Sequence, residues 1–525
     1  MKNIYGKKIE LFQYQAEILK KIKNKNAIVA MPTGSGKTPV AYKWAFDDSK
    51  TERVIFTAPI KALSNERYRE LVENFGKESV GINTGDIKKN IDAPIIACTQ
   101  EIYTNTYASL PNQKVVIDEI HYIFDNTDRA RAYVDGIRKS SSNSQILLLS
   151  ATIGNPENLK QYIERVSNRK FVVAETDERP VPLEYVGYVD PVENTEYTPM
   201  IIFLFSYRGV EGTAMRLAME TPSLPNEQVE KIKEIAKELR INNANILSLA
   251  ERGVVTYHGG LLFKEKVFSE ELARKGLAKY IVGTDALSLG VNLPAKTVVF
   301  GQLAKYYDGP ISKREFLQMA GRAGRYGLFD KGYVGFFYSG FESFDYDTES
   351  LYYDLLDAPV EAGHIKLTPD IGAILRKETT IDEEAKFISA VSVDLEENEM
   401  LFTEKEARNR ITDIMEMVYE YADEYIGEKD SAEKFFELLG EVWFPEYDTL
   451  MNCRVARLLL TYGKIDISDI IDLNEIEPAM VDGRGLYKLL QIRKHLKFLK
   501  SCGYKVVGIN KLNETIEKID HLVLE

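Results

Sequence analysis

The most informative segment of the chain reads Ala27-Ile28-Val29-Ala30-Met31-Pro32-Thr33-Gly34-Ser35-Gly36-Lys37-Thr38. Its first four residues are apolar and predict a buried strand, and the residues from Pro39 onward predict a helix, whose first turn tolerates a proline. Between strand and helix, glycines let backbone N–H groups turn inward, and the helix N-terminus adds its positive dipole. The pattern predicts a phosphate-binding loop in an α/β domain.

The residue types in this loop suggest a role for each position. We expect the backbone from Thr33 to Gly36 to surround the phosphates, Lys37 to reach the β- and γ-phosphates, and the Thr38 hydroxyl to bind Mg²⁺. The usual pattern G-x-x-x-x-G-K-[ST] has glycine where this chain has Met31. A chance turn rich in Gly and Ser is the alternative. The strand before the loop and the helix after it disfavour that alternative.

A second apolar run ends in two acidic residues and reads Val115-Val116-Ile117-Asp118-Glu119-Ile120-His121. At the end of a strand beside a phosphate loop, Asp118 would hold Mg²⁺ through its water shell. Glu119 would orient and deprotonate the attacking water. An Asp-Glu pair that stands alone is usually a solvated loop. Together with the phosphate loop, this pair predicts an ATPase that uses Mg²⁺.

The chain divides into three parts by its hydrophobic patterning. Short apolar runs separated by helix-length segments recur through the first two thirds of the chain and predict buried parallel strands in α/β layers. Later segments, such as Glu404–Tyr425 and Leu486–Ser501, have the pattern of helices. We predict an α/β domain over residues 1–190, a second over residues 191–345, and a mostly helical C-terminal domain over residues 346–525, with room for a small winged-helix element.

An arginine-containing segment lies near the end of the second predicted domain and reads Gln318-Met319-Ala320-Gly321-Arg322-Ala323-Gly324-Arg325. Arg322 and Arg325 are three residues apart, so on a helix they share a face. A surface basic turn is the alternative for such a segment taken alone. Its place in a second α/β domain instead predicts arginines that reach the γ-phosphate bound by the first domain, with Gln318 beside them in the catalytic set. ATP would then join the two domains, and hydrolysis would release them.

Composition excludes several classes of protein. Of the 525 residues, 44% are hydrophobic, which is ordinary for a globular chain, and no run approaches the roughly 18 apolar residues of a membrane span. Residues 1–8 lack the apolar stretch of a signal peptide. The three cysteines are far apart, and the five histidines have no ligand spacing, so we expect neither a disulfide scaffold nor a zinc site. The expectation is a cytoplasmic protein without a membrane segment.

The net charge is unevenly distributed along the chain. The total is −13, residues 341–450 carry −21 and residues 451–525 carry +2, which leaves +6 for residues 1–340. An acidic total argues against a protein that coats nucleic acid through its whole surface, but it permits a strand to bind in one basic cleft. The acidic stretch would repel phosphates. We expect it to lie away from a bound strand or to contact a protein partner.

These blocks, in this order, resemble superfamily 2 helicases, and within them the superkiller-like (Ski-like) DExH group. The resemblance covers about residues 11–340 and implies two tandem RecA-like domains. It implies that Gln15, in Leu11-Phe12-Gln13-Tyr14-Gln15, contacts the adenine base, and that Ser150 and Thr152 couple hydrolysis to strand movement. The stretch from Asp285 to Pro294 is the most similar to the group, and it includes Gly290, which we assign to the nucleotide.

The resemblance also implies which residues contact a nucleic-acid strand. They are Pro59, Lys61, Asn65, Thr84, Gly85, Thr99 and Glu101 in the first domain, and Ser206, His258, Gly259, Thr284 and Asp285 in the second. Hydroxyls, glycine N–H groups and helix N-termini suit phosphates, and Lys61 and Arg67 supply positive charge. None of these residue types reads a base edge well, so we expect little sequence preference.

Two features of the group bear on strand separation. The β-hairpin that separates a duplex corresponds to Leu303–Ile311, where Asp308-Gly309 suits a turn but Pro310 limits the returning strand. The helix that crosses the path of the exiting strand corresponds to Leu486–Lys500, which has apolar residues on one side and basic residues on another. An ordinary surface helix with a solvated basic face is the equally weighted alternative.

The expected function is an ATP-dependent helicase or translocase that uses Mg²⁺ and moves, by resemblance, in the 3′ to 5′ direction along single-stranded nucleic acid. RNA is favoured, because residues 59–65 look more like the RNA-processing members than the DNA-repair members. One alternative is a DNA repair or defence helicase of the same family. Another is an ATP-timed clamp that recruits a nuclease and does not unwind. An ATPase unconnected with nucleic acid is disfavoured, and the resemblance suggests a monomer.

Overall fold

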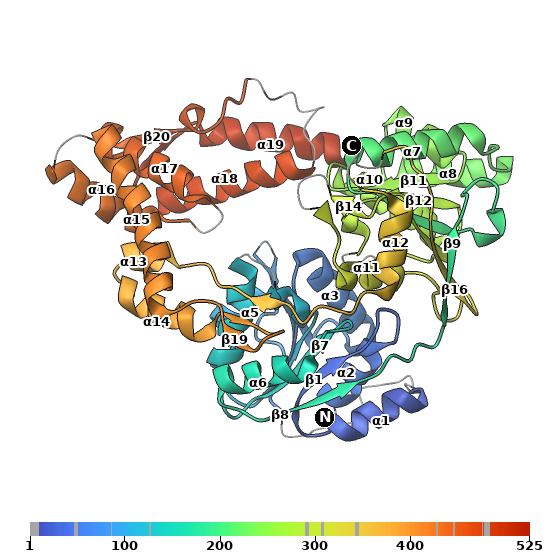
Figure 1. Cartoon of the computed structure of the whole chain (residues 1–525). Coiled ribbons are helices and arrows are strands. Elements are labelled where there is room, and N and C mark those ends of the chain that lie inside the picture. The colour runs from blue at the N-terminus through green and yellow to red at the C-terminus, as the bar shows by residue number, and fades with distance from the viewer. Residues whose placement is uncertain are drawn as a thin grey trace.

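The computed structural model describes residues 10–46, 51–85, 87–124, 128–288, 293–305, 309–341, 346–426, 429–444, 447–474, 476 and 483–524. Two large, mainly parallel sheets with helices on their faces are followed by a mostly helical region (Figure 1). The fold class expected from the sequence, two tandem RecA-like α/β domains and a helical C-terminal region, is confirmed.

The first sheet has the strand order β4-β3-β5-β2-β6-β7-β1-β8. All its pairs are parallel except β3 with β4. The strands are β1 (Asn26–Ala30), β2 (Arg53–Ala58), β3 (Val80–Asn83), β4 (Lys88–Lys89), β5 (Ile95–Thr99), β6 (Gln113–Ile117), β7 (Gln145–Ser150) and β8 (Phe171–Glu175). Most strand residues are fully buried, because helices cover both faces and leave neither side of a strand to water.

Each face of the first sheet packs against its own helices. The helices α1 (Gln13–Ile22), α2 (Lys37–Ala45) and α3 (Lys61–Phe75) contribute to the core on one face. The helices α5 (Asp128–Lys139) and α6 (Pro156–Ser167) contribute to the core on the other face. Short helical turns α4 (Gln100–Ile102), η1 (Tyr103–Tyr107) and η2 (Ile120–Phe124) follow the ends of strands.

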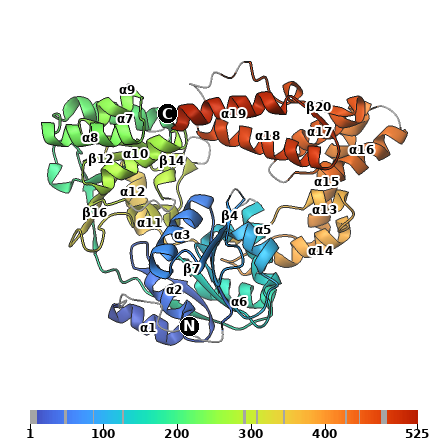
Figure 2. The ribbon, with the colours of Figure 1, turned by 180° about the vertical axis from the view of Figure 1, so that it is seen from behind.

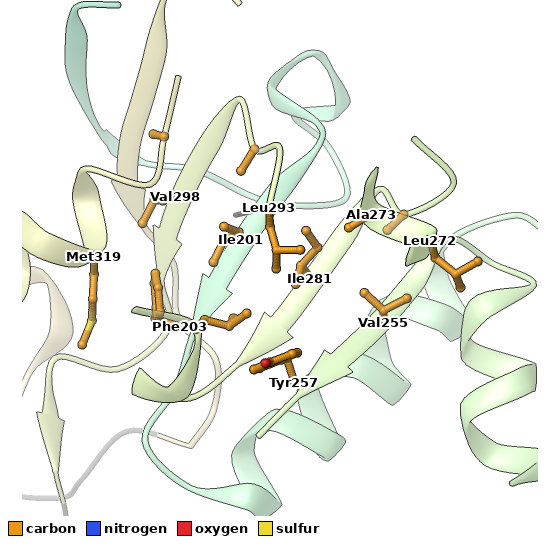
Figure 3. Close-up of a cluster of buried hydrophobic side chains, with 14 of the residues drawn as sticks. Ile201, Phe203, Val255, Tyr257, Leu272, Ala273, Ile281, Leu293, Val298 and Met319 are labelled. Carbon is orange, nitrogen blue, oxygen red and sulfur yellow. The ribbon is translucent and has the colours of Figure 1, made fainter. Parts of the chain in front are cut away.

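The second sheet has the strand order β11-β12-β10-β13-β16-β9, and all its pairs are parallel. Its strands are β9 (Leu183–Tyr188), β10 (Met200–Phe203), β11 (Val254–Tyr257), β12 (Tyr280–Gly283), β13 (Thr297–Phe300) and β16 (Gly332–Phe336). The surrounding helices are α7 (Tyr207–Glu220), α8 (Asn226–Glu238), α9 (Ala244–Ala250), α10 (Phe263–Arg274), α11 (Lys313–Ala320) and α12 (Thr348–Asp357). Figure 3 shows the core on one face, where Ile201 and Phe203 of β10 lie between Val298 of β13 and Ile281 of β12.

Two elements differ from the domain boundaries expected from the sequence. β9 pairs with β16 in the second sheet, although residues 1–190 were assigned to the first domain. Tyr352 and Leu355 of α12 belong to the core of the second sheet, although α12 follows the expected boundary at residue 345. Both elements lie close to an expected boundary in the sequence. Only their pairing and packing with distant segments assign them to the second domain.

The C-terminal region begins with a small unit that packs on the first domain. This unit contains β17 (His364–Ile365), α13 (Ile371–Leu375), α14 (Ile381–Val391), β18 (Val393–Asp394) and β19 (Glu399–Met400). Its three short strands form one antiparallel sheet, and α13 and α14 lie between β17 and β18 in the chain; the expected winged-helix element stays a prediction. Ile365, Leu367, Val391 and Leu395 join the core on one face of the first sheet.

The remainder of the region is a helical bundle. It contains α15 (Glu404–Ile426), α16 (Lys429–Val442), α17 (Thr449–Tyr462), β20 (Lys464–Asp466), η5 (Ile467–Asp469), α18 (Gly483–Ser501), β21 (Lys505–Val507) and α19 (Ile509–Leu524). Buried residues of α15 recur at helical spacing, at positions 407, 411, 415, 418 and 422, because one face of the helix must meet its neighbours. Among the described residues, no helix combines the length and apolarity needed to cross a membrane.

The three parts of the chain close into a ring-like arrangement. Figures 1 and 2 show α18 and α19 running from the C-terminal bundle toward the second domain, where α19 ends near α10. Leu262, just before α10, packs against the hydrophobic core of the bundle. The C-terminal region therefore contacts the first domain at one end and the second domain at the other.

A buried ion pair joins the small unit that contains β17, β18 and β19 to the first domain. Arg131 of α5 donates from Nη2 to Oε2 of Glu384 on α14 at 3.2 Å, and its Nη1 donates to the carbonyl of Thr368 at 3.1 Å. The other oxygen of Glu384 accepts from the Asp370 backbone N–H at 2.9 Å. The Glu384 side chain is only 4% exposed, so removing its charge would leave a guanidinium without its counter-ion in a poorly hydrated site.

We predict that Glu384→Gln lowers the free energy of unfolding by about 3 kcal/mol, the range expected when one partner of a buried ion pair is lost. Urea unfolding followed by circular dichroism measures the change. The matched control is Glu157→Gln, which breaks an exposed pair with Lys160 and should cost less than about 1 kcal/mol. Equal effects of the two substitutions would show that the Arg131–Glu384 contact does not hold the unit in place.

Candidate active site and strand-contact surface

A cavity of about 840 Å³ lies between the two α/β domains. From the first domain it is lined by residues of the predicted phosphate loop and by both carboxylates that follow β6. From the second domain it is lined by the arginine segment that follows α11. The predicted residues on its wall are Thr33, Gly34, Gly36, Lys37, Thr38, Asp118, Glu119, Arg322 and Arg325. Residues almost 300 positions apart in sequence are thus placed around one space, which we call the nucleotide cavity after its expected ligand.

The phosphate loop has the backbone that its glycines permit. Gly34 and Gly36 have φ of +83° and +80°, a region that disfavours other residues, and Gly36 directly precedes α2. Lys37 Nζ donates to the carbonyl of Met31 at 3.3 Å across the loop. The Met31 side chain is fully buried in the core beside α1 and α2, which explains how the loop accommodates methionine at the position where glycine is usual.

The structure places Gln15 on the loop backbone. Its Nε2 donates to the carbonyl of Ser35 at 2.9 Å and to that of Gly36 at 3.3 Å, while its Oε1 accepts from the Phe12 N–H at 2.9 Å. Tyr14 adds a hydrogen bond from its hydroxyl to the Ser35 carbonyl at 2.7 Å. Gln15 is 2% exposed, so in this structure its amide fixes the loop, and the expected contact with adenine stays a prediction.

The two predicted magnesium ligands, Thr38 and Asp118, lie on either side of a guanidinium. Arg67 of α3 donates from Nη2 to Asp118 Oδ2 at 3.2 Å and from both terminal nitrogens to Thr38 Oγ1 at 3.4 Å. A cation therefore already lies between one hydroxyl and one carboxylate, the kind of oxygen donors that Mg²⁺ prefers. Burial raises the pKa of Asp118, as does Glu119, while Arg67 and Lys37 oppose that rise. The residues fit a magnesium ion.

Arg67 is a correction to the expectation from the sequence. It was expected to supply charge to a nucleic-acid strand, but its guanidinium points into the nucleotide cavity. Besides Thr38 and Asp118 it contacts Tyr42 at 3.2 Å and Glu70 at 2.8 Å. Lys61 and Arg67 are six residues apart, about one and two-thirds turns of α3, so their side chains lie on different faces of the helix.

Glu119 has the strained backbone often found in catalytic residues. Its φ is +52°, which is uncommon for a residue with a side chain. Its Oε2 is buried, has no hydrogen-bond partner within the described part of the chain, and lies 3.3 Å from Nδ1 of His121. Burial lowers the pKa of His121 to about 3, so this imidazole is neutral near pH 7. A carboxylate with an unused oxygen beside the phosphate loop can accept a proton from water.

The arginine segment contributes two cations to the cavity and places its glutamine elsewhere. Burial lowers the pKa of Arg322, while Glu119 and Glu66 raise it. Burial also lowers the pKa of Arg325, and nearby Arg274 lowers it further. Gln318 lines a separate, adjacent cavity of about 340 Å³, together with His121 and Asp285, and not the nucleotide cavity. Its assignment to the catalytic set stays a prediction.

The strand-contact residues expected in the first domain follow β2, β3 and β5, which are neighbours in the sheet. Parallel strands end at the same edge, so these residues gather there. Lys61 lies against Gly85, since a Cβ on that glycine would come within 3.5 Å of Lys61 Nζ. Gly85 is exposed, and Lys61, Asn65 and Glu101 are half-buried; Pro59, Thr84 and Thr99 are buried. The first group can meet a strand directly, and the second shapes the turns that present it.

The residues expected in the second domain follow β10, β11 and β12, again three neighbouring strands. Ser206 and Asp285 are exposed, and Gly259 is half-buried. His258 and Thr284 are 3% and 5% exposed, and both accept backbone N–H groups of their own turns, at 3.2 Å from Gly260 and 3.3 Å from Ala286. These two residues order the turns in this structure, and a direct contact with a strand stays a prediction.

Ser150 and Thr152 lie where β7 meets the phosphate loop. The Ser150 carbonyl accepts from the Met31 N–H at 3.1 Å, and Thr152 lines a cavity of about 500 Å³ beside Thr33 and Gly321. This position beside both domains agrees with a coupling role, which stays a prediction. Gly290 lies outside the described residues, as do the turn residues 306–308 of the expected hairpin. The hairpin strands β14 (Ala304–Lys305) and β15 (Gly309–Pro310) pair over two residues each.

Three contributors to the site were not found from the sequence. They are the guanidinium of Arg67, the guanidinium of Arg179 in the connection between the two sheets, and an aromatic pair. Phe12 and Tyr326 make an edge-to-face contact at 5.1 Å, and Tyr326 lines the nucleotide cavity. Phe12 lies in the segment Leu11–Gln15 that the sequence singles out, but nothing in the sequence relates it to Tyr326, which is 64% exposed.

Comparisons with known proteins agree with this geometry. Residues 12–160 match the DEAD/DEAH box helicase family, and residues 226–327 match the helicase conserved C-terminal domain. Both matched models describe helicase domains, and DEAD/DEAH box helicases generally use ATP with Mg²⁺.

Curated relatives share about 30% identity with the chain. "DExH-box ATP-dependent RNA helicase DExH9" of Arabidopsis thaliana is 29% identical over 61% of this chain and 40% of its own length. "ATP-dependent RNA helicase mtr4" of Schizosaccharomyces pombe is 31% identical over 59% of this chain and 35% of its own length. "Superkiller complex protein 2" of Homo sapiens is 29% identical over 62% of this chain and 32% of its own length. The chain thus spans about two fifths or less of the relatives it matches.

The neutral His121 predicts a pH dependence of stability. Its pKa is about 3 when folded, and about 6.5 in an unfolded chain, so the unfolded chain binds the additional proton as the pH falls below about 6.5. This group should therefore destabilise the fold by about 1.4 kcal/mol at pH 5.5 relative to pH 7.5. His121→Gln should reduce the difference in unfolding free energy between these two pH values by that amount. Urea unfolding at both values checks it, and an unchanged difference would contradict a neutral His121.

Proposed function

We propose that this chain, a DEAD/DEAH box helicase distantly related to the Mtr4 and superkiller-like DExH-box RNA helicases, hydrolyses ATP with Mg²⁺ to move 3′ to 5′ along single-stranded RNA. The observation that carries the proposal is the cavity between the two domains. It is lined by a phosphate loop and two carboxylates on one side and by two arginines on the other. We further propose that the protein acts in the cytoplasm as a monomer.

The first domain would bind the triphosphate and prepare the water. Backbone N–H groups around Gly34 and Gly36, with Lys37, would hold the phosphates. Thr38 and Asp118 would hold Mg²⁺, which when bound neutralises charge between the β- and γ-phosphates. Arg67 would have to leave its contacts with these two residues. Glu119, with one oxygen unused, would accept the proton of the attacking water.

The second domain would complete the site. Arg322 and Arg325 would face the γ-phosphate, where negative charge is redistributed during transfer, and would stabilise it electrostatically. Binding the phosphates would bring the domains together, and loss of the γ-phosphate would weaken that attraction. Each cycle of approach and separation would change the distance between the two groups of strand-contact residues at the carboxyl ends of the sheets.

The C-terminal bundle supplies a surface along which the strand could pass. In both views α18 lies on the inner side of the ring-like arrangement and faces the first domain (Figures 1 and 2). Leu489, Leu496 and Leu499 are buried in the bundle, and Lys497 and Lys500 are exposed. The apolar side thus fixes the helix, and the basic side remains available for phosphates. The acidic stretch at 341–450 would suit a protein partner.

RNA is the proposed strand for two reasons. The segment Pro59–Asn65 resembles the RNA-processing members of the group, and the relatives named above are described as RNA helicases or as part of the superkiller complex. Hydroxyl and glycine contacts to phosphates do not by themselves distinguish RNA from DNA. A DNA repair or defence helicase is therefore the alternative that experiment must decide.

One observation favours a second candidate, an ATP-timed clamp that recruits a nuclease without unwinding. The hairpin strands β14 and β15 pair over only two residues each, which gives little rigid surface to separate a duplex. In this candidate, ATP would time the release of the strand, and the acidic C-terminal stretch would bind the nuclease.

We predict that Lys37→Ala and Glu119→Gln each lower the strand-stimulated ATPase rate by at least about 100-fold, for different reasons. Lys37→Ala should also weaken the binding of a fluorescent ATP analogue, because a phosphate contact is lost. Glu119→Gln should leave that binding within about threefold, because the carboxylate acts on water. Lys160→Ala on the surface of α6 is the control and should change neither quantity. Full activity in either site variant would overturn the proposed mechanism.

We predict that single-stranded RNA stimulates the ATPase at least about tenfold more than single-stranded DNA of equal length and sequence. Salt must be fixed and low, since phosphate contacts weaken as it rises. Equal or better stimulation by DNA would favour the repair or defence alternative. Stimulation by neither would remove the strand-contact argument and leave the ATPase alone.

The same preparation distinguishes a helicase from a clamp. Displacement of a labelled strand from a duplex with a 3′ single-stranded overhang, but not from one with a 5′ overhang, is expected for 3′ to 5′ movement. ATP-dependent release of single strands without displacement of any duplex would support the clamp.

A further inference from the structure

Arg179 lies in the connection that carries the chain from the first sheet to the second. The connection runs from the end of β8 at Glu175 to the start of β9 at Leu183. A residue in such a connection belongs to neither core, so its side chain can contact both domains. Arg179 does so beside the nucleotide cavity.

The guanidinium holds the backbone of the loop that carries Arg322. Nη2 of Arg179 donates to the carbonyl of Gly321 at 3.3 Å and to that of Ala323 at 2.9 Å. These two carbonyls lie on either side of Arg322 in the sequence. One side chain thus fixes the backbone immediately before and immediately after an arginine of the nucleotide cavity.

The same nitrogen lies against the phosphate loop of the other domain. A Cβ on Gly34 would come within 2.8 Å of Nη2, so the guanidinium lies directly against this glycine of the phosphate loop. The two loops also meet directly, since a Cβ on Gly321 would come within 2.5 Å of Thr33 Cβ. Arg179 therefore lies at the junction of the phosphate loop and the arginine loop.

The buried charge of Arg179 costs stability, which is unexpected for a residue whose only role is to stabilise the fold. Burial lowers its pKa to about 10, so it stays charged near pH 7 in a site that disfavours charge. Within the part of the chain that the structure describes, no carboxylate pairs with it, and its buried Nε has no hydrogen-bond partner. Two neutral carbonyls are a weak offset for a buried charge. A role in the reaction gives a reason to keep the charge there.

We propose that Arg179 is a positioning residue for ATP hydrolysis: it holds the arginine loop against the phosphate loop so that Arg322 reaches the γ-phosphate. The inference rests on the proposed ATPase mechanism. It gives the connection between the domains an indirect part in catalysis, because Arg179 places another residue and does not contact the reacting atoms.

The test is a double-mutant cycle on the ATPase rate. Arg179→Gln should lower kcat by about 10- to 100-fold and change KM for ATP by less than about threefold, because the phosphate loop still binds the nucleotide. Arg322→Gln should lower kcat at least as much. The double variant should be no slower than Arg322→Gln alone, since Arg179 acts through Arg322. Additive losses would overturn the proposal, and so would an unchanged kcat in either single variant.

Arg169→Gln is the matched control. Arg169 also donates to two backbone carbonyls, those of Ser140 and Ser144, but within the first domain and away from the nucleotide cavity. This variant should lower thermal stability and leave kcat within about twofold. A kcat loss in Arg169→Gln equal to that in Arg179→Gln would mean that general destabilisation, and not positioning, explains the result.

Arg179→Lys provides the second variant if Arg179→Gln folds poorly. A lysine ammonium keeps the charge and can donate to the same carbonyls, so it should recover at least about tenfold of the kcat lost in Arg179→Gln. No recovery in a folded Arg179→Lys protein would count against the proposal. A wild-type protein without ATPase activity would overturn the proposed function itself, whereas an active wild type with an unaffected Arg179→Gln would overturn only this inference.

Discussion

The arrangement of the two domains depends on how buried charge is balanced in the space they share. Lys37 comes from one domain and Arg322 and Arg325 from the other, and burial lowers the pKa of both arginines, which means that the site disfavours their charge. Asp118 and Glu119 offset part of this charge. A polyphosphate anion would offset the rest, so that binding a nucleotide and joining the domains become one event.

Much of the fold could be predicted because its signals are local. The strand before the phosphate loop, the glycines inside it and the helix after it are adjacent in the sequence, and the buried runs of the two sheets are apolar on both faces. The carboxylates after β6 could be assigned for a related reason, because the ends of parallel strands lie at one edge of the sheet. The arginines after α11 were assigned from their spacing of three residues and their place in the second α/β domain.

The rest could not be predicted because it depends on contacts between distant elements. β9 and α12 join the second domain through pairing with β16 and packing beneath it, and no local pattern distinguishes these from other short elements. Arg67 and Lys61 lie on one helix, and only the folded structure shows that Arg67 turns to Thr38 and Asp118, the predicted magnesium ligands. No local pattern indicates that the Gln15 amide is buried and donates to the backbone of the phosphate loop, since that loop lies about 20 residues further along the chain.

The closure of the ring-like arrangement by a non-covalent contact has a topological consequence. The C-terminal region joins the core of the first domain through residues such as Ile365 and Leu395, and it meets the second domain where Leu262 packs on the bundle. In the proposed function, a strand bound between the three parts would have no lateral way out while this contact holds. A nucleic acid with a free end would be threaded, whereas a circular or end-blocked one would enter only when α19 parts from α10. The strength of that small apolar contact would then set how fast such molecules are loaded and how long they are retained.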